Sequence, residues 1–182
     1  KNRVVFYDFS EIGKNVPNRL VGGFDDEFQG DMVPRVTYMG DPYSCAFSGK
    51  ALTFFSSRNL ASPELLEQRT IEERIDSVFY SDEYAAAIVR NTNGEYGSRL
   101  EVYKKDGTHV LSKEFNFEYT HADFDGDLII LYNEDSCRIY NMSGTEKFDA
   151  TFDFPVSRIR KGRFPGTLVV TGPQQMRELK LH

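Results

Sequence analysis

Short runs of alternating apolar and polar residues follow one another along most of the chain, a pattern typical of β-strands with one buried face. The clearest run opens the segment Arg99–Phe115, where Leu100 and Val102 fall on one side of a predicted strand and Tyr103 on the other. The segment Ser136–Phe152 repeats this order 37 residues later. A glycine lies at the same place in both segments, where a tight turn commonly requires a positive φ. Both segments are therefore predicted to be β-hairpins.

An aromatic ring returns near the end of several similar strands. The rings belong to Tyr7, Phe55, Tyr103, Tyr140 and His182. Their separations of 48, 48, 37 and 42 residues are close to the roughly 40–45 residues of one four-stranded WD40-type propeller blade. Three further strand-like runs precede each late copy. We therefore expect an all-β fold, a β-propeller-like array of four-stranded antiparallel blades.

The repeats divide the chain into five parts of unequal completeness. Their approximate bounds are residues 1–31, 34–72, 76–117, 119–154 and 156–182. With the strands of each blade lettered a to d, the chain reads c-d, then three full a-b-c-d units, then a-b-c. We therefore expect a single propeller-like domain or the C-terminal half of one, in a ring of six, seven or eight blades. Any leader or membrane anchor should lie upstream.

One segment favours a helix when it is considered alone. Ser62–Arg69 begins with a serine that can cap a helix, has proline at the first helical position and continues with good helix formers. The repeat instead requires a strand d at about residues 65–71. Because repeat phase reflects tertiary packing and helix propensity is a weak preference, we predict the strand and keep the helix as the alternative.

Composition agrees with a compact β protein and argues against some partners. Fifteen Phe and ten Tyr supply large side chains for packing between sheets, whereas Trp is absent. A net charge of −6 and a pI near 5.1 argue against binding to nucleic acid or to an anionic membrane surface. The sequence has no run of about 18 apolar residues, so no segment is predicted to span a bilayer.

The two cysteines, Cys45 and Cys137, are predicted to be small buried residues. Cys137 takes the core-facing place of Leu100 in its repeat, and Cys45 lies inside a strand-like run. A disulfide between blades is the alternative. The spacing of the two cysteines fits no metal site, and we predict no cofactor.

The string Asp123–Asp127 has the acidic residues of a calcium loop but not their spacing. Carboxylates at alternate positions around a glycine can surround a hard cation. In the helix-loop-helix calcium motif the glycine is sixth and a glutamate twelfth, whereas here the glycine is fourth and a predicted strand follows at once. We therefore interpret the string as a hairpin turn and predict no metal site.

Motifs of nucleophilic catalysis are also missing from the sequence. His109, His121 and His182 are far apart along the chain, and neither a G-x-S-x-G turn nor a glycine-rich phosphate loop occurs. Asn141–Ser143 is a glycosylation sequon at a predicted hairpin tip, which matters only in a eukaryotic secretory pathway. We therefore predict no catalytic residues.

Four stretches carry a resemblance to a known family. They are Val33–Met39, Ile75–Ser81, Leu100–Tyr103 with Asp106 and Gly107, and Asp135–Tyr140 with Gly144. They resemble an uncharacterised propeller-like family of Gram-positive, mostly clostridial bacteria, catalogued as a domain of unknown function. The resemblance implies an N-terminal membrane anchor and an extracytoplasmic, cell-surface propeller whose C-terminal half corresponds to this chain. No site residues are established for that family, so the resemblance implies none.

Two classes of function remain open for this fold. The first is a non-catalytic binding module in which loops at one propeller face hold a protein, peptide or glycan. The second is an enzyme, for example a glycan-active hydrolase, with carboxylates from different blades at the propeller centre. Convergence of acidic groups from separate blades in one pocket would favour the enzyme.

The binding module has a local candidate site in two connections between strands b and c. The connection 91–98 is longer than its counterpart 133–136, and extra loop length in one repeat often lies on the binding face. The candidate binding residues are Asn91, Glu95, Tyr96, Asn133 and Glu134, with Tyr96 as the best anchor.

Overall fold

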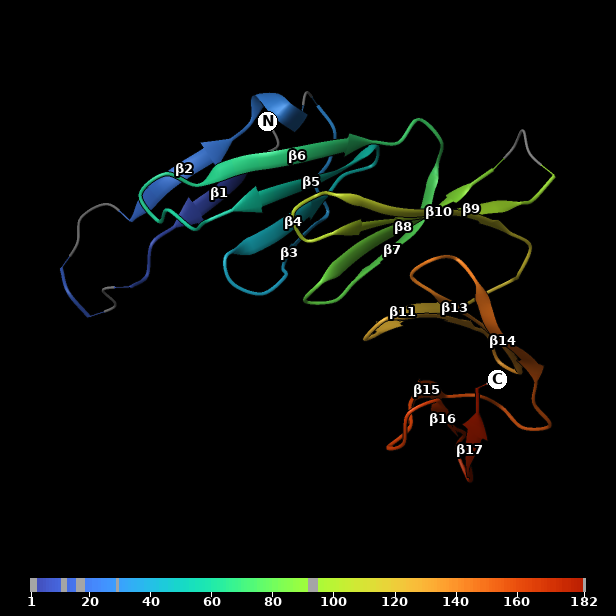
Figure 1. Cartoon of the computed structure of the whole chain (residues 1–182). Coiled ribbons are helices and arrows are strands. Elements are labelled where there is room, and N and C mark those ends of the chain that lie inside the picture. Colours follow the sequence, from blue (N-terminus) through green and yellow to red (C-terminus); the bar gives the residue numbers. More distant parts are fainter. Residues whose placement is uncertain (1–2, 11–12, 16–18, 29, 92–94, 182) are drawn as a thin grey trace.

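The computed structural model describes residues 3–10, 13–15, 19–28, 30–91 and 95–181. Within these residues it contains strands β1 to β17 and a short 3-10 turn, η1 (Asp26–Phe28), but no α-helix and no helix that could span a membrane. The strands form small sheets that follow one another along an arc from the N-terminus to the C-terminus (Figure 1). The all-β prediction is confirmed.

Three sheets have four antiparallel strands each, paired in chain order. Blade B comprises β3 (Arg35–Tyr38), β4 (Tyr43–Phe47), β5 (Ala51–Ser56) and β6 (Glu64–Thr70). Blade C comprises β7 (Ile75–Tyr80), β8 (Tyr84–Arg90), β9 (Ser98–Lys104) and β10 (His109–Phe115). Blade D comprises β11 (His121–Asp125), β12 (Leu128–Tyr132), β13 (Ser136–Asn141) and β14 (Glu146–Thr151).

The first and last sheets are smaller within the described residues. Blade A pairs β1 (Val4–Tyr7) with β2 (Leu20–Phe24), and blade E pairs β15 (Arg158–Lys161), β16 (Thr167–Thr171) and β17 (Met176–Lys180) in that order. The first strands of blades C and D, β7 and β11, contact each other. This contact places strand a at the inner edge of the arc and strand d at the outer edge.

Apolar side chains of neighbouring blades pack together to form the core. Representative buried residues are Phe55 between blades A and B, Phe54 between B and C, Ile129 between C and D, and Ile139 between D and E. Strand β5 is buried at every residue because blades A and C cover its two faces. Each fully buried Phe or Ile side chain stabilises the fold by about 1.5–3 kcal/mol.

The repeated aromatic rings occupy equivalent strands. Phe55, Tyr103 and Tyr140 lie on the third strands β5, β9 and β13, and all three are buried. Tyr7 lies on β1 and is 53% exposed. His182 lies outside the described residues. The ring therefore marks strand c of each full blade, as the sequence predicted.

A cation and an aromatic ring meet in the same way at two interfaces between blades. The Arg69 guanidinium of β6 lies 5.9 Å from the centre of the Tyr103 ring, and the Lys113 ammonium of β10 lies 5.6 Å from the centre of the Tyr140 ring. Such contacts stabilise by about 0.5–1 kcal/mol at exposed sites. Strand d of one blade is thus joined to strand c of the next.

The turns between strands c and d also contact the preceding blade. Gly107 has a φ of +88° and lies against Glu67 of β6, while Gly144 has a φ of +78° and lies against Leu111 of β10. The carbonyl oxygen of Gly107 accepts a hydrogen bond from Nε of Arg69 at 2.9 Å. Glycine is required at Gly107 by both its φ and the close approach of the neighbouring blade.

Strand d carries a β-bulge at the same place in blades A to D. The residue without a partner on strand c is Val21, Leu66, Val110 or Lys147, respectively. A bulge bends the strand and interrupts its ladder. The outer edges of these blades therefore do not present a regular row of backbone groups to another strand.

The segment with conflicting signals is a strand. Residues 64–70 form β6, which pairs with β5 and places Leu65 against the core between blades A and B. The strand prediction is confirmed and the helix alternative is wrong. Tertiary pairing outweighs local helix propensity here, because the core contact of Leu65 needs an extended chain.

Both cysteines are free and buried. The prediction of buried thiols is confirmed, and the alternative of a disulfide between blades is wrong. Burial raises the pKa of the Cys137 thiol to about 12 and also raises the pKa of Cys45. Both groups are therefore protonated thiols at neutral pH.

The acidic string Asp123–Asp127 is a hairpin turn, as predicted. Asp125 pairs with Leu128 across the end of β11 and β12, and Gly126 has a φ of +61°.

Candidate functional site

The longer of the two predicted loops is tied to the neighbouring strand d. The Asn91 side chain donates a hydrogen bond from Nδ2 to Oε1 of Glu114 at 2.8 Å, and its backbone N–H donates to the carbonyl of Gly97 at 3.1 Å. Glu95 and Tyr96 follow on the exposed side of the loop, and Tyr96 is 40% exposed. Residues 92–94 of the loop lie outside the described residues.

The shorter predicted loop is a compact turn built on Asn133. Its Oδ1 accepts hydrogen bonds from the N–H groups of Asp135 and Ser136 at 3.1 and 2.8 Å, and its Nδ2 donates to the carbonyl of Glu118 at 2.7 Å. The Glu134 side chain is exposed. Asn133 is thus engaged in holding the turn, whereas Glu134 is accessible to a partner.

The connection between blades C and D joins these two loops. Asn116 accepts a hydrogen bond from the N–H of Gly97 on its Oδ1 at 2.6 Å, and its carbonyl accepts one from Arg138 at 3.2 Å. The Arg138 guanidinium also lies 5.3 Å from the centre of the Phe117 ring. We call residues 91, 95–97, 114–120 and 133–135 together the loop face.

The loop face presents acidic groups as well as Tyr96. Besides Glu114, which accepts the hydrogen bond from Asn91, four exposed carboxylates lie on it, those of Glu95, Glu118, Glu134 and Asp135. None of the four forms an ion pair within the part of the chain that the structure describes. The nearby Arg138 is itself paired to Asp149 at 2.6 Å, so it leaves the four carboxylates unneutralised.

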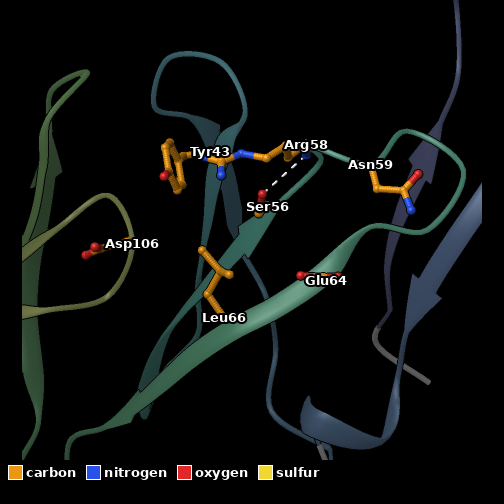
Figure 2. A pocket seen from close by; sticks show the side chains of 7 residues that line it. All are labelled: Tyr43, Ser56, Arg58, Asn59, Glu64, Leu66 and Asp106. Atoms are coloured by element: carbon orange, nitrogen blue, oxygen red, sulfur yellow. Dashed lines mark hydrogen bonds between the residues drawn. The ribbon is translucent and has the colours of Figure 1, made fainter.

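A groove of about 390 Å³ lies between blades B and C, at the ends of their strands opposite the loop face. It is lined by Tyr43, Ser56, Arg58, Asn59, Glu64, Leu66 and Asp106. Figure 2 shows Leu66 and Glu64 on β6, Tyr43 and Arg58 at the strand ends, and Asp106 on the facing hairpin. We call it the Tyr43 groove. Sequence analysis did not find it.

Carboxylates from two blades meet in the Tyr43 groove. Glu64 belongs to blade B and Asp106 to the β9–β10 hairpin of blade C. The N–H of Thr108 donates to Asp106 at 2.9 Å and holds the pKa of that carboxyl below its usual value. Acidic groups of two blades therefore line one groove, which lies away from the inner edge of the arc.

A second groove between blades B and C, of about 630 Å³, contains a network around a buried carboxylate. Glu101 on β9, whose side chain is 11% exposed, accepts hydrogen bonds from Arg99 at 2.6 Å and Ser112 at 2.9 Å, and its other oxygen lies 3.1 Å from Nε2 of His109. Arg99 also pairs with Glu73 at 2.8 Å. Every charged group of this network has a counter-charge or a hydrogen bond.

Blade D has the same network with its charges exchanged. Arg138 occupies the place of Glu101, 37 residues later, and pairs with Asp149 at 2.6 Å and with Glu146 at 3.5 Å. These two acids occupy the places of Ser112 and His109. Comparing the polar positions of the two aligned hairpins would have revealed this exchange.

Three carboxylates at the inner edge already have partners. Asp76 on β7 pairs with Arg90 at 3.2 Å, and Asp123 on β11 pairs with Arg160 of blade E at 2.6 Å. Asp125 accepts a hydrogen bond from the N–H of Lys161 at 2.6 Å. Among the described residues, no three His, Cys, Asp or Glu side chains are grouped so that they could hold a metal ion.

The sequence profile described as a family of unknown function, DUF5711, matches residues 1–181. The chain belongs to this family. The resemblance to a propeller-like family of unknown function is thereby confirmed, whereas the clostridial source and membrane anchor of DUF5711 proteins stay predictions. No curated protein matches the chain.

Solved structures similar to this DUF5711 chain are β-propellers. Sqt1 of Saccharomyces cerevisiae has 12% identity and a TM-score of 0.56, over 91% of this chain and 51% of that one. HIRA(644–1017) has 11% identity and a TM-score of 0.52, over 79% and 49%. The Pan2 WD40 domain of Neurospora crassa has 10% identity and a TM-score of 0.48, over 90% and 53%.

The chain spans about half the length of these three structures. At such low identity the likeness shows the fold alone, and the fold assignment rests on the first two. The predicted fold class, a WD40-like propeller array of four-stranded antiparallel blades, is confirmed.

Proposed function

We propose that this chain is a non-catalytic interaction module that binds a protein or peptide through its loop face. The observation that carries the proposal is that two loops of different blades are hydrogen-bonded to one connection, through Asn116 and Asn133. Loops fixed before binding lose less conformational entropy when a partner docks. A WD40-like array of blades supplies the rigid support for such loops.

The chemistry of the loop face favours a basic partner segment. Tyr96 offers a large ring with a polar tip, the type of residue that often anchors an interface. The carboxylates of Glu95, Glu118 and Glu134 lie on the same loop face and form no ion pairs in the described part of the chain. Lys and Arg side chains of a partner would supply those charges, and the attraction should weaken as salt concentration rises.

We also propose an extracytoplasmic, membrane-anchored setting, which the family resemblance supports. A fusion of the natural full-length protein to alkaline phosphatase, which is active only outside the cytoplasm, tests this setting. Phosphatase activity at the C-terminal end of the chain is the expected result. Activity of a cytoplasmic reporter at the same position would overturn it.

Site-specific photocrosslinking in the native host tests the loop face. A photoreactive amino acid at Tyr96 should give a discrete adduct with one protein, and the same amino acid at Phe164, on an exposed turn of blade E, should not. The double variant Glu95→Gln/Glu134→Gln should weaken capture of that protein. The matched variant Asp82→Asn/Glu178→Gln, which removes two exposed carboxylates elsewhere, should leave capture unchanged.

Adducts formed from Phe164 but not from Tyr96 would contradict the loop face. Equal loss of capture in the two double variants would show a nonspecific charge effect instead of a site.

A further inference from the structure

We propose that the Tyr43 groove is a second binding site, which takes a neutral carbohydrate. The proposal is independent of the loop face, because the groove lies at the opposite ends of the strands and uses other residues. It rests on the mixture of apolar and hydrogen-bonding groups that meet there.

The apolar part of the groove is provided by Tyr43 and Leu66. Tyr43 is half-buried at the start of β4, and the Lys105 ammonium lies 5.5 Å from the centre of its ring. Leu66 is 37% exposed because it is the unpaired residue of the β6 bulge, which turns its side chain away from the core. A ring and an aliphatic side chain suit the C–H faces of a sugar.

The polar part of the groove has unused hydrogen-bonding capacity of both kinds. Oδ1 of Asn59 accepts from the N–H of Ala61 at 3.2 Å, which leaves its Nδ2 as a donor. The Ser56 hydroxyl accepts from the N–H of Arg58 at 3.2 Å and keeps its own proton to donate (Figure 2). Asp106 accepts hydrogen bonds from the N–H and the side chain of Thr108, and its two carboxylate oxygens have about four lone-pair sites in all, so the group can accept further bonds.

Arg58 and Glu64 add one charge of each sign. In the described part of the chain neither side chain forms an ion pair, and both are exposed. Each sugar hydroxyl can both donate and accept, so a wall that carries guanidinium, amide, hydroxyl and carboxylate groups matches several hydroxyls together. Arg58 and Lys105, whose ammonium lies at the Tyr43 ring, balance the two carboxylates Glu64 and Asp106, so the groove has no excess charge that would favour an anion or a simple cation.

The backbone around the groove disfavours an extended peptide. A peptide that adds a strand needs a regular edge, and the bulge at Leu66 interrupts the edge of β6 within the groove. The volume of about 390 Å³ is near the lower end of the usual range for small-ligand sites. A short oligosaccharide therefore fits the groove better than a protein segment.

Asp106 is not suited to be the proton donor of a glycoside-cleaving pair. A glycoside-cleaving pair needs one protonated carboxylic acid with a raised pKa. The pKa of Asp106 is instead lowered by its hydrogen bond from Thr108, so Asp106 is ionised at neutral pH.

The neighbouring interface does not repeat this chemistry. Between blades C and D, the place of Ser56 is taken by Lys104, that of Leu66 by Val110 and that of Asp106 by Ser143. The proposed site is therefore specific to the interface between blades B and C.

Saturation-transfer NMR with cellotriose, maltotriose and chitotriose tests the proposal on the whole chain. At least one trisaccharide should bind with a Kd below about 10 mM. Arg58→Gln and Glu64→Gln should each weaken that binding about fivefold to tenfold, because each removes a charged hydrogen-bonding group. Both side chains are exposed, so neither change should affect folding, which circular dichroism checks.

Arg163→Gln is the matched control, because Arg163 is an exposed arginine on a turn of blade E. Tyr96→Ala should also leave sugar binding unchanged, which separates this site from the loop face. Failure of all three sugars to bind at about 10 mM would overturn the proposal, as would binding that both groove variants leave unchanged. Release of shorter sugars during overnight incubation would show that the groove cleaves sugars instead of only binding them. A photocrosslinked protein adduct that Arg58→Gln abolishes would show that the groove binds a protein instead of a sugar.

Discussion

Replacing Gly107 by alanine tests how the blades are joined. An added Cβ would lie 2.5 Å from Cβ of Glu67 and 3.1 Å from the Phe54 ring. The positive φ costs an alanine about 1–2 kcal/mol, and overpacking against the preceding blade adds about 1–3 kcal/mol. Movement of the turn would also weaken the hydrogen bond from Arg69 to the Gly107 carbonyl. We expect Gly107→Ala to lower the free energy of unfolding by about 2–5 kcal/mol.

The variant Gly166→Ala separates the backbone strain at positive φ from the overpacking against a neighbouring blade. Gly166 has a φ of +72°, but an added Cβ would meet no atom within 4 Å. The free energy of unfolding of this control variant should therefore fall by only about 1–2 kcal/mol. Urea unfolding followed by far-UV circular dichroism measures both variants, and Gly107→Ala should lose at least about 1 kcal/mol more than the control. Equal losses would show that contact with the preceding blade does not restrict this turn.

The thiols of Cys45 and Cys137 should not react with Ellman's reagent in the native protein, because they are buried, and two should react after unfolding without reductant. Fewer than two would reveal a disulfide. Millimolar calcium should leave Tm unchanged, because Asp123 already pairs with Arg160 and Asp125 already accepts a hydrogen bond from the backbone N–H of Lys161; a rise abolished by Asp125→Ala would contradict the turn interpretation. Glu73→Gln should lower the free energy of unfolding by less than about 1 kcal/mol at neutral pH. The hydrogen bond from Arg99 lowers the pKa of Glu73, so the pair stabilises the fold only while this carboxyl is ionised. The difference in unfolding free energy between wild type and variant should therefore vanish as the pH falls below 4.5 and Glu73 becomes protonated in wild type. A difference that does not change with pH would exclude a contribution from the charge pair.

Most of the fold could be predicted because every blade uses the same alternation of residues and the same turns. The equivalence of Leu100 and Cys137, for example, placed both in the core of their blades. Local signals misled only where they were considered alone. Residues 64–70 carry a good helix start, yet they form a strand because pairing with β5 and burial of Leu65 decide their conformation.

The Tyr43 groove could not be predicted in the same way. Tyr43 and Asp106 lie 63 residues apart and meet only because two blades pack side by side. The exposure of Leu66 depends on a bulge, which is defined by the partner strand and leaves no clear mark in the sequence. Loop length did point to the connection after Asn91, but not to the hydrogen bonds through Asn116 that join it to the next blade.

The exchanged networks of blades C and D bear on how such a chain grows by gene duplication. The partners His109 and Ser112 of Glu101 lie in the same hairpin as Glu101. The partners Glu146 and Asp149 of Arg138 likewise lie in the same hairpin as Arg138. A duplicated hairpin would carry these counter-charges with it, so the new copy would not contain an uncompensated buried charge, which costs several kcal/mol. We therefore expect insertion or loss of a whole blade to be tolerated more readily than exchange of single strands between blades.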